Sequence, residues 1–217
     1  MLGGFRFDII GDYLPLLLKG ALLTVGISVG SILLGSLLGL AVGFGKMSRR
    51  WFLHYPAVCY INFFRGTPLY VQILMAHFGL IPPILGHTDA IVAAITALSL
   101  NSAAYSAEIY RAGIQSIDKG QTEAAHSLGM NPVQTMRHII LPQAVKRMIP
   151  AFGNEFITLL KDSSLIAIVA APEIMYWANA MRGQYMRIWE PYLTAALIYF
   201  VLTYSLNKLL AYVERKV

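Results

Sequence analysis

Polar side chains at helical spacing interrupt an apolar segment in the middle of the chain. Asn101, Tyr105 and Glu108 fall at i, i+4 and i+7, which places them on one face of a helix over about 10 Å. Their chemistry is the binding of polar and charged groups. Ionisable residues in apolar spans are costly and usually face a protein interior or a watery cavity. We therefore expect this face to line a cavity.

A second polar face occurs further along the chain. Glu155, Thr158 and Asp162 share one side of a helical segment, and Lys161 lies on the neighbouring side. With the carboxylate of the first face, three carboxylates stand against two cations within apolar segments, Arg65 and Lys161. The expected cavity is therefore mildly acidic, and a solute with a positive charge would suit it.

An interruption at Arg65-Gly66-Thr67-Pro68 divides another apolar segment. Pro68 disfavours the α conformation at Thr67 and is suited to begin a new half-helix with Thr67 as its N-cap. The amide groups at the start of such a half-helix can bind an anion, as in transporters with discontinuous helices. We expect an anionic group of the solute near Thr67 to Leu69, and its cationic group at one of the three carboxylates.

The same charged residues have a structural interpretation as well. Arg65 could pair with Glu108 or Asp162, and Glu108 could meet Arg111 at i+3 on its own helix. In that case the ion pairs hold helices together and bind no solute. The sequence leaves both interpretations open for each of these residues.

Motifs typical of enzymes occur outside the structural context that they need. The G-x-S-x-G pattern at 26–30, which contains Ser28, requires a strand, a sharp turn and a helix, but lies within a continuous apolar run. The histidines form no H-E-x-x-H pattern, and the single Cys59 excludes an internal disulfide and a Cys-based metal site. We expect Cys59 to be a small buried side chain. No catalytic residue, metal or cofactor is predicted in this chain.

The elements that carry these residues are predicted to be membrane helices. Hydrophobic residues make up 57% of the 217-residue chain and charged residues only 13%, about half the charged share of a soluble domain. This excludes a disordered chain, a nucleic-acid-binding tail and an ordinary soluble enzyme. Ala21 to Gly45 contains 25 residues without a charge, enough to cross a bilayer. Five spans are predicted in one all-α, polytopic membrane domain, 1–217, at about 21–45, 52–80, 89–111, 148–171 and 191–207.

The limits and direction of these spans follow from prolines and charges. Pro82 and Pro83 are predicted to end the second span, and Pro172 the fourth. Most Lys and Arg residues lie after the first span, between the third and fourth, and at the end of the chain. The positive-inside rule then places the N-terminus outside, and the polar section 111–147 and the C-terminus in the cytoplasm.

Small residues at four-residue spacing mark one face of the first span. Ser31, Gly35, Gly39 and Gly43 would let another helix approach closely where lipid gives no hydrophobic drive for association. The partner could be a helix of the same chain or of another subunit. The sequence leaves this choice open.

The polar section between the third and fourth spans contains a compact helical pattern at about 119–142. Thr122 is predicted to cap a helix that begins at Glu123, Gly129 to end it in a left-handed conformation, and Asn131-Pro132 to begin a second short helix. The alternative is a solvated surface hairpin. The pattern is E-A-A, three residues, G, nine residues, I-x-L-P, and its fixed positions include Glu123, Ala124, Ala125, Gly129, Leu141 and Pro142.

This pattern resembles the EAA loop of membrane subunits of bacterial ATP-binding cassette (ABC) importers. The segments 63–68, 101–108 and 160–165 are similar to those of the polar amino acid uptake (His/Gln/Arg-type) permeases. The resemblance implies a multi-pass permease in a prokaryotic inner membrane, without enzymatic activity of its own. It further implies a cytoplasmic ATPase subunit that binds ATP and Mg, a second permease copy in a homodimer or heterodimer, and an extracytoplasmic binding protein, with no nucleic acid partner.

The acidic cavity favours a basic amino acid such as arginine, lysine or histidine as the cargo, moved by alternating access. Glutamine or cystine, carried by the same machinery, is the alternative. An ion-coupled secondary transporter, with Glu108 and Asp162 as proton relays, is a further one. Such a transporter should show inverted repeats and needs no docking loop, and the sequence shows no repeat.

Overall fold

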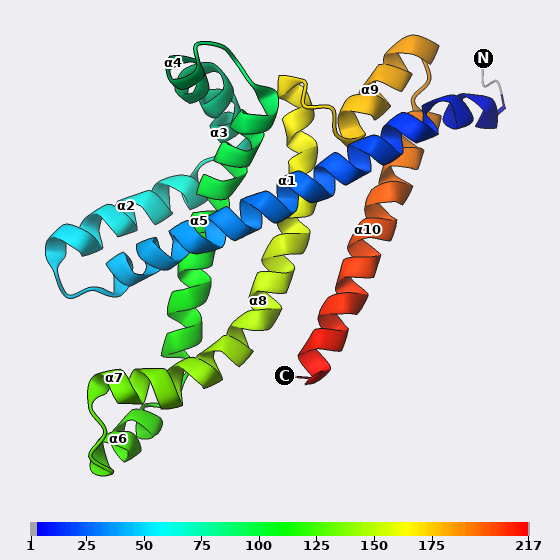
Figure 1. Ribbon diagram of the computed structural model, residues 1–217. Coiled ribbons are helices and arrows are strands. Elements are labelled where there is room, and N and C mark those ends of the chain that lie inside the picture. Colours follow the sequence, from blue (N-terminus) through cyan, green and yellow to red (C-terminus); the bar gives the residue numbers. More distant parts are fainter. Residues whose placement is uncertain (1–3, 217) are drawn as a thin grey trace.

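The computed structural model describes residues 4–216, and this part of the chain is helical throughout, with no strand (Figure 1). The long helices are α1 (Phe7–Met47), α2 (Trp51–Gly66), α5 (Ala90–Gln115), α8 (Leu141–Asp162), α9 (Ile174–Tyr185) and α10 (Trp189–Lys216). The short helices are α3 (Leu69–Met75), α4 (Ile81–Leu85), α6 (Lys119–Ser127) and α7 (Pro132–Thr135), the π-helices η1 (Ala76–Leu80) and η2 (Met136–Ile140), and the 3₁₀-helix η3 (Ser163–Val169).

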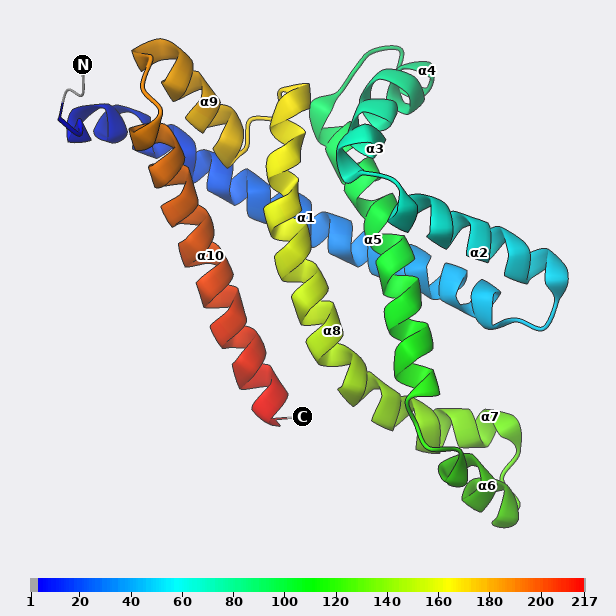
Figure 2. The same ribbon diagram turned by 180° about the vertical axis from the view of Figure 1, so that it is seen from behind.

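Helix α1 crosses the molecule obliquely and packs against α5 (Figures 1 and 2). The chain turns back after α1 so that α2 lies beside the second half of α1. Helices α6 and α7 and the C-terminal end of α10 lie at one end of the molecule, whereas α4, α9 and the beginning of α1 lie at the other (Figures 1 and 2). The arrangement thus has two distinct ends.

Three helices are long and apolar enough to cross a membrane: α1, α5 and α10. A fourth span results if α2 and the helical stretch Leu69–Leu85, which are bent by 108° relative to each other, count as one broken span. The polar helix α8 occupies most of the predicted fourth span and does not meet the same criteria. By length and composition, the described residues therefore contain three or four candidate spans.

One sequence prediction about a helix limit is wrong, and one helix was missed. Pro82 and Pro83 do not end the second segment, because both lie in the first turn of α4, where a missing N–H removes no essential bond. The helix ends at Gly86, whose φ is +77°. Helix α9 was not predicted at all. Its N-cap is Glu173, a buried residue whose carboxylate accepts a hydrogen bond from the Tyr176 amide at 2.7 Å.

The small-residue face of α1 packs against α5. A Cβ atom at Gly39 would lie 2.6 Å from Ser106 Cβ, and one at Gly35 would lie 2.8 Å from Ser102 Cβ. Only glycine allows this separation, because Cβ atoms do not approach other atoms so closely. Packing within one chain, one of the two interpretations of this face, is therefore confirmed for these glycines.

This packing predicts that alanine substitutions at two glycines of the same helix have opposite effects on the free energy of unfolding. Gly39→Ala should lower the free energy of unfolding by about 1–3 kcal/mol, because the added methyl group has no space. Gly30→Ala is the matched control, since a Cβ there meets no atom within 4 Å and alanine favours the helix. Thermal unfolding of the purified protein measures both. Equal melting temperatures for the two variants would contradict the assigned seam.

Candidate functional site

The broken span has a different local structure from the predicted one. Pro68 is the N-cap residue and α3 begins at Leu69, so the prediction of Thr67 as N-cap is wrong. The Thr67 hydroxyl donates instead to Phe63 O at 2.8 Å. The side chain of Gln72, which is 5% exposed, turns back to the break and donates to Thr67 O at 3.1 Å and Thr67 Oγ1 at 2.9 Å. Gln72 was not among the predicted site residues.

A pocket of about 140 Å³ lies between the break, α5 and α8. It brings together polar residues that the sequence placed on three separate segments: Thr67, Asn101, Tyr105, Glu155, Thr158 and Asp162. Leu69, Leu98 and Leu159 supply its apolar walls. The predicted polar faces of the two helices are thus turned toward each other across one small space.

A larger cavity of about 650 Å³ adjoins this pocket, because Tyr105, Glu155 and Thr158 line both. Arg65 and Glu108 belong to the larger cavity, which extends between α5 and α8 to Ser116 and Arg147, near the start of α6. Pro68 and Lys161 line neither cavity, and Lys161 is exposed. The two cavities together form a continuous space from the break toward the α6–α7 end, with polar side chains from all three segments on its walls.

The three predicted carboxylates have different surroundings. Glu108 accepts from Lys46 Nζ at 2.6 Å and from Arg111 Nη2 at 2.8 Å, and Arg65 Nη1 lies 3.9 Å away. The structural interpretation therefore holds for this residue, and Arg65 pairs with Glu108 and not with Asp162. The Arg65 guanidinium also lies over the Tyr105 ring, 5.2 Å from its centre. Lys46 as a partner was not predicted.

Glu155 and Asp162 lack such partners. No Lys, Arg or His nitrogen of the described chain lies within 4.0 Å of either carboxylate. Glu155 accepts a hydrogen bond from the buried Ser102 hydroxyl at 3.0 Å, which ties α8 to α5. These carboxylates lie in the small pocket, whereas the carboxylate of Glu108 is already surrounded by cations.

The first half of the loop 119–142 is one helix with complete caps. Helix α6 begins at Lys119, because Asp118 caps it through Gly120 N at 2.7 Å, so the predicted start at Glu123 with a Thr122 cap is wrong. Gly129 has a φ of +82°, as predicted. Its amide donates to His126 O at 2.9 Å, and the Met130 amide donates to Ala125 O at 3.1 Å, which together form a Schellman motif.

The second half of the loop leads directly into α8. Asn131 and Gln134 form a capping box with two bonds of 2.9 Å, which confirms the predicted second helix. The π-helix η2 follows, and α8 begins at Leu141. Leu128 and Val133 are 83% and 75% exposed at the tip of the loop. The loop is a compact unit that protrudes at the end of the molecule and presents apolar side chains.

Among the described residues, neither the G-x-S-x-G pattern nor a metal-ligand group has the structural context that it needs. Ser28 lies within α1, where its hydroxyl donates to Thr24 O at 2.7 Å, so the G-x-S-x-G pattern lacks its strand and turn. No group of three or more His, Cys, Asp or Glu residues suited to a metal occurs between residues 4 and 216. Cys59 is exposed, so its predicted burial is wrong.

Comparison with known proteins connects this geometry to one family. The family described as "binding-protein-dependent transport system inner membrane component" matches residues 31–217. The crystal structure of an amino acid ABC transporter with histidines is similar to the chain with a TM-score of 0.93 and 40% identity, covering 99% of this chain and 100% of that one.

Curated relatives are similar over nearly the whole length. The chain is 42% identical to the arginine transport system permease protein ArtQ of Bacillus subtilis (strain 168) over 207 residues, which cover 94% of this chain and 93% of the relative. It is 34% identical to the glutamine transport system permease protein GlnP of Escherichia coli (strain K12) over 214 residues, 98% of this chain and 97% of the relative. The names of these relatives thus include different amino acids.

The ion pairs of Glu108 predict a loss of stability on its replacement. Glu108→Gln leaves Lys46 and Arg111 without their carboxylate and should lower the free energy of unfolding by about 2 kcal/mol, less than for a fully buried pair. Thermal unfolding should show that Lys46→Met restores part of the loss. Glu214→Gln, the same change at an exposed site on α10, is the control. An unchanged melting temperature for Glu108→Gln would contradict this assignment.

Proposed function

The chain belongs to the family of binding-protein-dependent transport system inner membrane components, and from this premise we propose that it carries amino acids with a cationic side chain. Its relatives are permeases of amino acid ABC transporters, and the chain is a helical inner membrane permease of this kind. Arginine, lysine and histidine are the proposed cargo. The chain catalyses no reaction itself.

One observation carries the choice of substrate. Glu155 and Asp162 line the same pocket of about 140 Å³ without an ion pair among the described residues. A carboxylate removed from water needs a cation or hydrogen-bond donors, and a guanidinium, ammonium or imidazolium group supplies both. The relative named for arginine and the related structure with histidines agree with this choice, whereas the glutamine permease keeps glutamine as an alternative.

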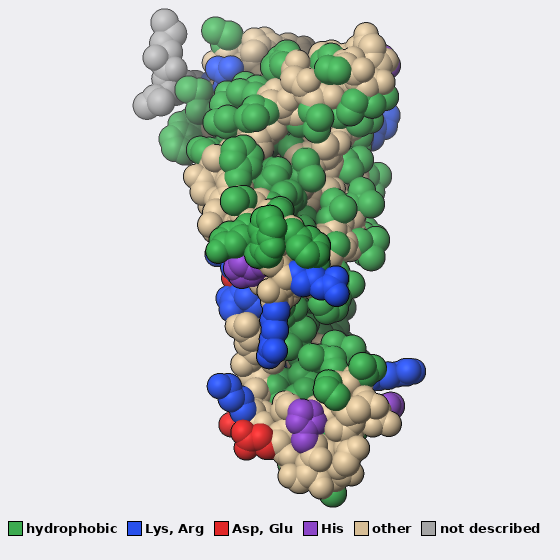
Figure 3. All heavy atoms as spheres, turned by 90° about the vertical axis from the view of Figure 1, so that its left-hand side faces the viewer, with side chains coloured by type: hydrophobic (Ala, Val, Ile, Leu, Met, Phe, Trp, Pro, Cys, Tyr) green, Lys and Arg blue, Asp and Glu red, His purple; other side chains and the backbone are tan. Residues whose placement is uncertain are grey.

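The positions of the two cavities suggest a direction of movement. The solute would enter the small pocket from the α4–α9 end and leave through the larger cavity toward α6 and α7. Its carboxylate would leave past Arg65, which lines the larger cavity. Lys and Arg side chains gather in the lower half of the face in Figure 3, toward α6 and α7, below a mainly hydrophobic region. By the positive-inside rule, we assign that end and the C-terminus to the cytoplasm and the N-terminus to the outside.

Counting α8 as a span gives the five spans of this proposal. Its polar face lines both cavities and so needs no contact with lipid. A helix with one polar and one apolar face is typical of a position between a cavity and a packed bundle. The broken pair α2 and Leu69–Leu85 is then the second span.

The loop of α6 and α7 is the proposed attachment to a cytoplasmic ATPase subunit that binds ATP and Mg. Leu128 and Val133 present apolar surface at its tip, and Gly129 fixes its turn. The predicted coupling residues Glu123, Ala124, Ala125, Leu141 and Pro142 all belong to α6 or to the start of α8. Because η2 joins the loop directly to α8, movement of the loop would shift Glu155 and Asp162.

The remaining partners follow from the family and from the size of the chain. The family description names binding-protein-dependent transport, and the binding protein is proposed to deliver the solute from outside. A second permease copy, the same chain or a related one, would complete the transporter. The other alternative, an ion-coupled secondary transporter, does not agree with this family. Uptake into liposomes that contain permease and binding protein but no ATPase would contradict the proposed dependence on ATP.

Removing either free carboxylate should reduce arginine transport selectively. Asp162→Asn and Glu155→Gln should each lower arginine uptake about tenfold, because one charge-assisted interaction is lost, and lower glutamine uptake much less. Liposomes with the complete importer, loaded with ATP, measure the uptake. Glu214→Gln serves as the charge control on an exposed site. Equal losses for arginine and glutamine would refute the acidic site.

The loop predicts a loss of coupling without a loss of assembly. Gly129→Val should reduce uptake per ATP hydrolysed several-fold, since a β-branched residue disfavours a φ of +82° and opens the Schellman motif. Gly86→Val introduces the same strain at a φ of +77° at the end of α4, away from the loop. It should cost stability alone. Uptake and ATP hydrolysis that keep their normal ratio in Gly129→Val would contradict the coupling role.

A further inference from the structure

A buried pair of amide side chains joins the broken span to α5. Gln72 lies on α3, one turn after the break, and is 5% exposed. Its Nε2 donates to Phe64 O at 2.9 Å in addition to the two bonds to Thr67. Across the interface, Asn101 Nδ2 donates to Gln72 Oε1 at 2.9 Å and reaches Phe64 O at 3.3 Å. The pair therefore ties both sides of the break to α5.

The chemistry of the partners determines which way each amide faces. Phe64 O and Thr67 O are backbone carbonyls and can only accept hydrogen bonds. Gln72 must therefore turn its NH₂ group toward them, which leaves its oxygen toward α5. Only a donor can meet that oxygen, so Asn101 must present its NH₂ group there. Reversing either amide would place two oxygen atoms against each other.

Because the Asn101 NH₂ group is held against Gln72, the Asn101 oxygen is left to face the cavity. Asn101 lines the pocket of about 140 Å³, and among residues 4–216 no hydrogen bond reaches its Oδ1. With Glu155 and Asp162, this oxygen gives the pocket a third acceptor and no amide donor from Asn101. The Tyr105 and Thr158 hydroxyls that also line the pocket can donate or accept. The groups that can only accept are therefore the two carboxylates and this oxygen, and they match the donors of a cationic group.

We infer that Gln72 is a positioning residue for substrate selection: it holds the Asn101 amide so that its oxygen faces the cavity and accepts a hydrogen bond from the cationic group of the solute. This inference rests on the proposed function. A freely turning asparagine could offer either a donor or an acceptor. Gln72 removes the donor, and so it selects against neutral solutes that present a carbonyl oxygen at the same place.

Arginine and citrulline distinguish these cases, because the guanidinium has five N–H donors and no acceptor, whereas the ureido group of citrulline has the same shape with one carbonyl oxygen. Titration calorimetry measures the binding of each to the assembled permease and ATPase, without the binding protein. Gln72→Met has a similar length but no polar group. It should lower the preference for arginine over citrulline about tenfold.

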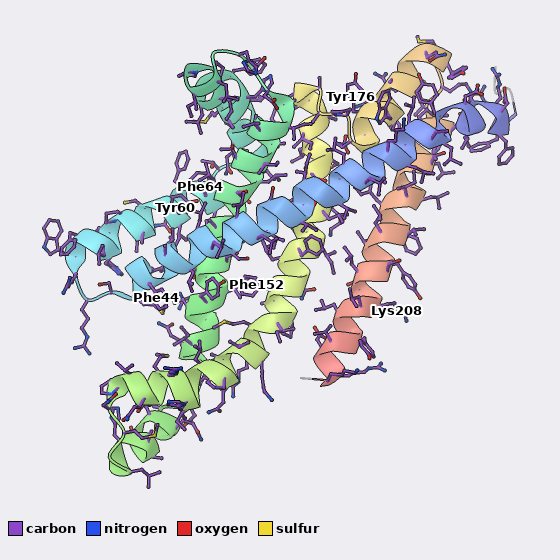
Figure 4. All side chains as sticks on the ribbon, in the orientation of Figure 1. Phe44, Tyr60, Phe64, Phe152, Tyr176 and Lys208 are labelled. Carbon is purple, nitrogen blue, oxygen red and sulfur yellow. The ribbon has the colours of Figure 1, made fainter. Side chains whose placement is uncertain are left out.

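A structural role alone would not reproduce the dependence on Asn101. Asn101→Leu should lower the preference by itself, and adding Gln72→Met to it should cause no further change, because Gln72 acts through Asn101. Tyr60→Phe is the matched control: it removes the bond from Tyr60 Oη to Leu100 O of 2.6 Å, another link between α2 and α5, and should leave the preference unchanged. Tyr60 and Phe64 lie on the part of α2 next to α5 (Figure 4).

Each outcome has one meaning. If the unaltered complex binds no arginine although it transports it, the proposed site is wrong. If it prefers arginine and Gln72→Met keeps that preference, or if the effects of the two variants add, the role of Gln72 is wrong. Should Gln72→Met fail to assemble, Gln72→Glu can be measured under conditions in which its buried carboxyl is protonated: the O–H then donates to Phe64 O and the carbonyl oxygen accepts from Asn101 Nδ2, so the preference for arginine should stay at its normal value. A tenfold fall would overturn the inference.

Discussion

The close packing of α1 on α5 is the constraint on which the rest of the structure depends. Gly35 and Gly39 have no side chain, so the two helices approach to a separation at which a Cβ atom would clash with α5. This contact fixes the rotation of α5, so that Ser106 faces α1 while Asn101 and Tyr105 face the cavity. It also brings the end of α1 to the end of α5, where the ion pairs of Glu108 form. Lipid supplies no hydrophobic drive for this association, and small residues take its place.

The distribution of charge follows from that framework. Glu108 is neutralised by cations from other parts of the chain, while Glu155 and Asp162 face a small pocket without such partners. Carboxylates of the same type thus have opposite roles, one in assembly and two at the proposed solute site. The broken span adds amides whose direction is fixed by backbone carbonyls. The pocket becomes rich in acceptors although the chain as a whole is basic.

Part of the fold and of the candidate site could be predicted from local sequence chemistry. Gly129 and Asn131-Pro132 specify their turns by sequence alone, and the polar faces of α5 and α8 follow from helical spacing. Long-range partners did not: Lys46 meets Glu108 across 62 positions, and no local pattern indicates it. The helix that contains Pro82 directly follows a π-helix, which no sequence pattern predicted. Cys59 is exposed because apolar side chains of a membrane chain face lipid as readily as a core. Gln72 could have been noticed from the sequence, because it is the one amide side chain in the otherwise apolar α3.

We propose that the pocket between the break, α5 and α8 holds the cationic group of the solute. Electron cryomicroscopy of the complete importer with arginine would show whether it does. We expect density for the guanidinium between Asn101, Glu155 and Asp162, with the Asn101 oxygen toward it. Arginine density against Glu108 instead, or an empty pocket in a complex that binds arginine within its permease, would contradict this site.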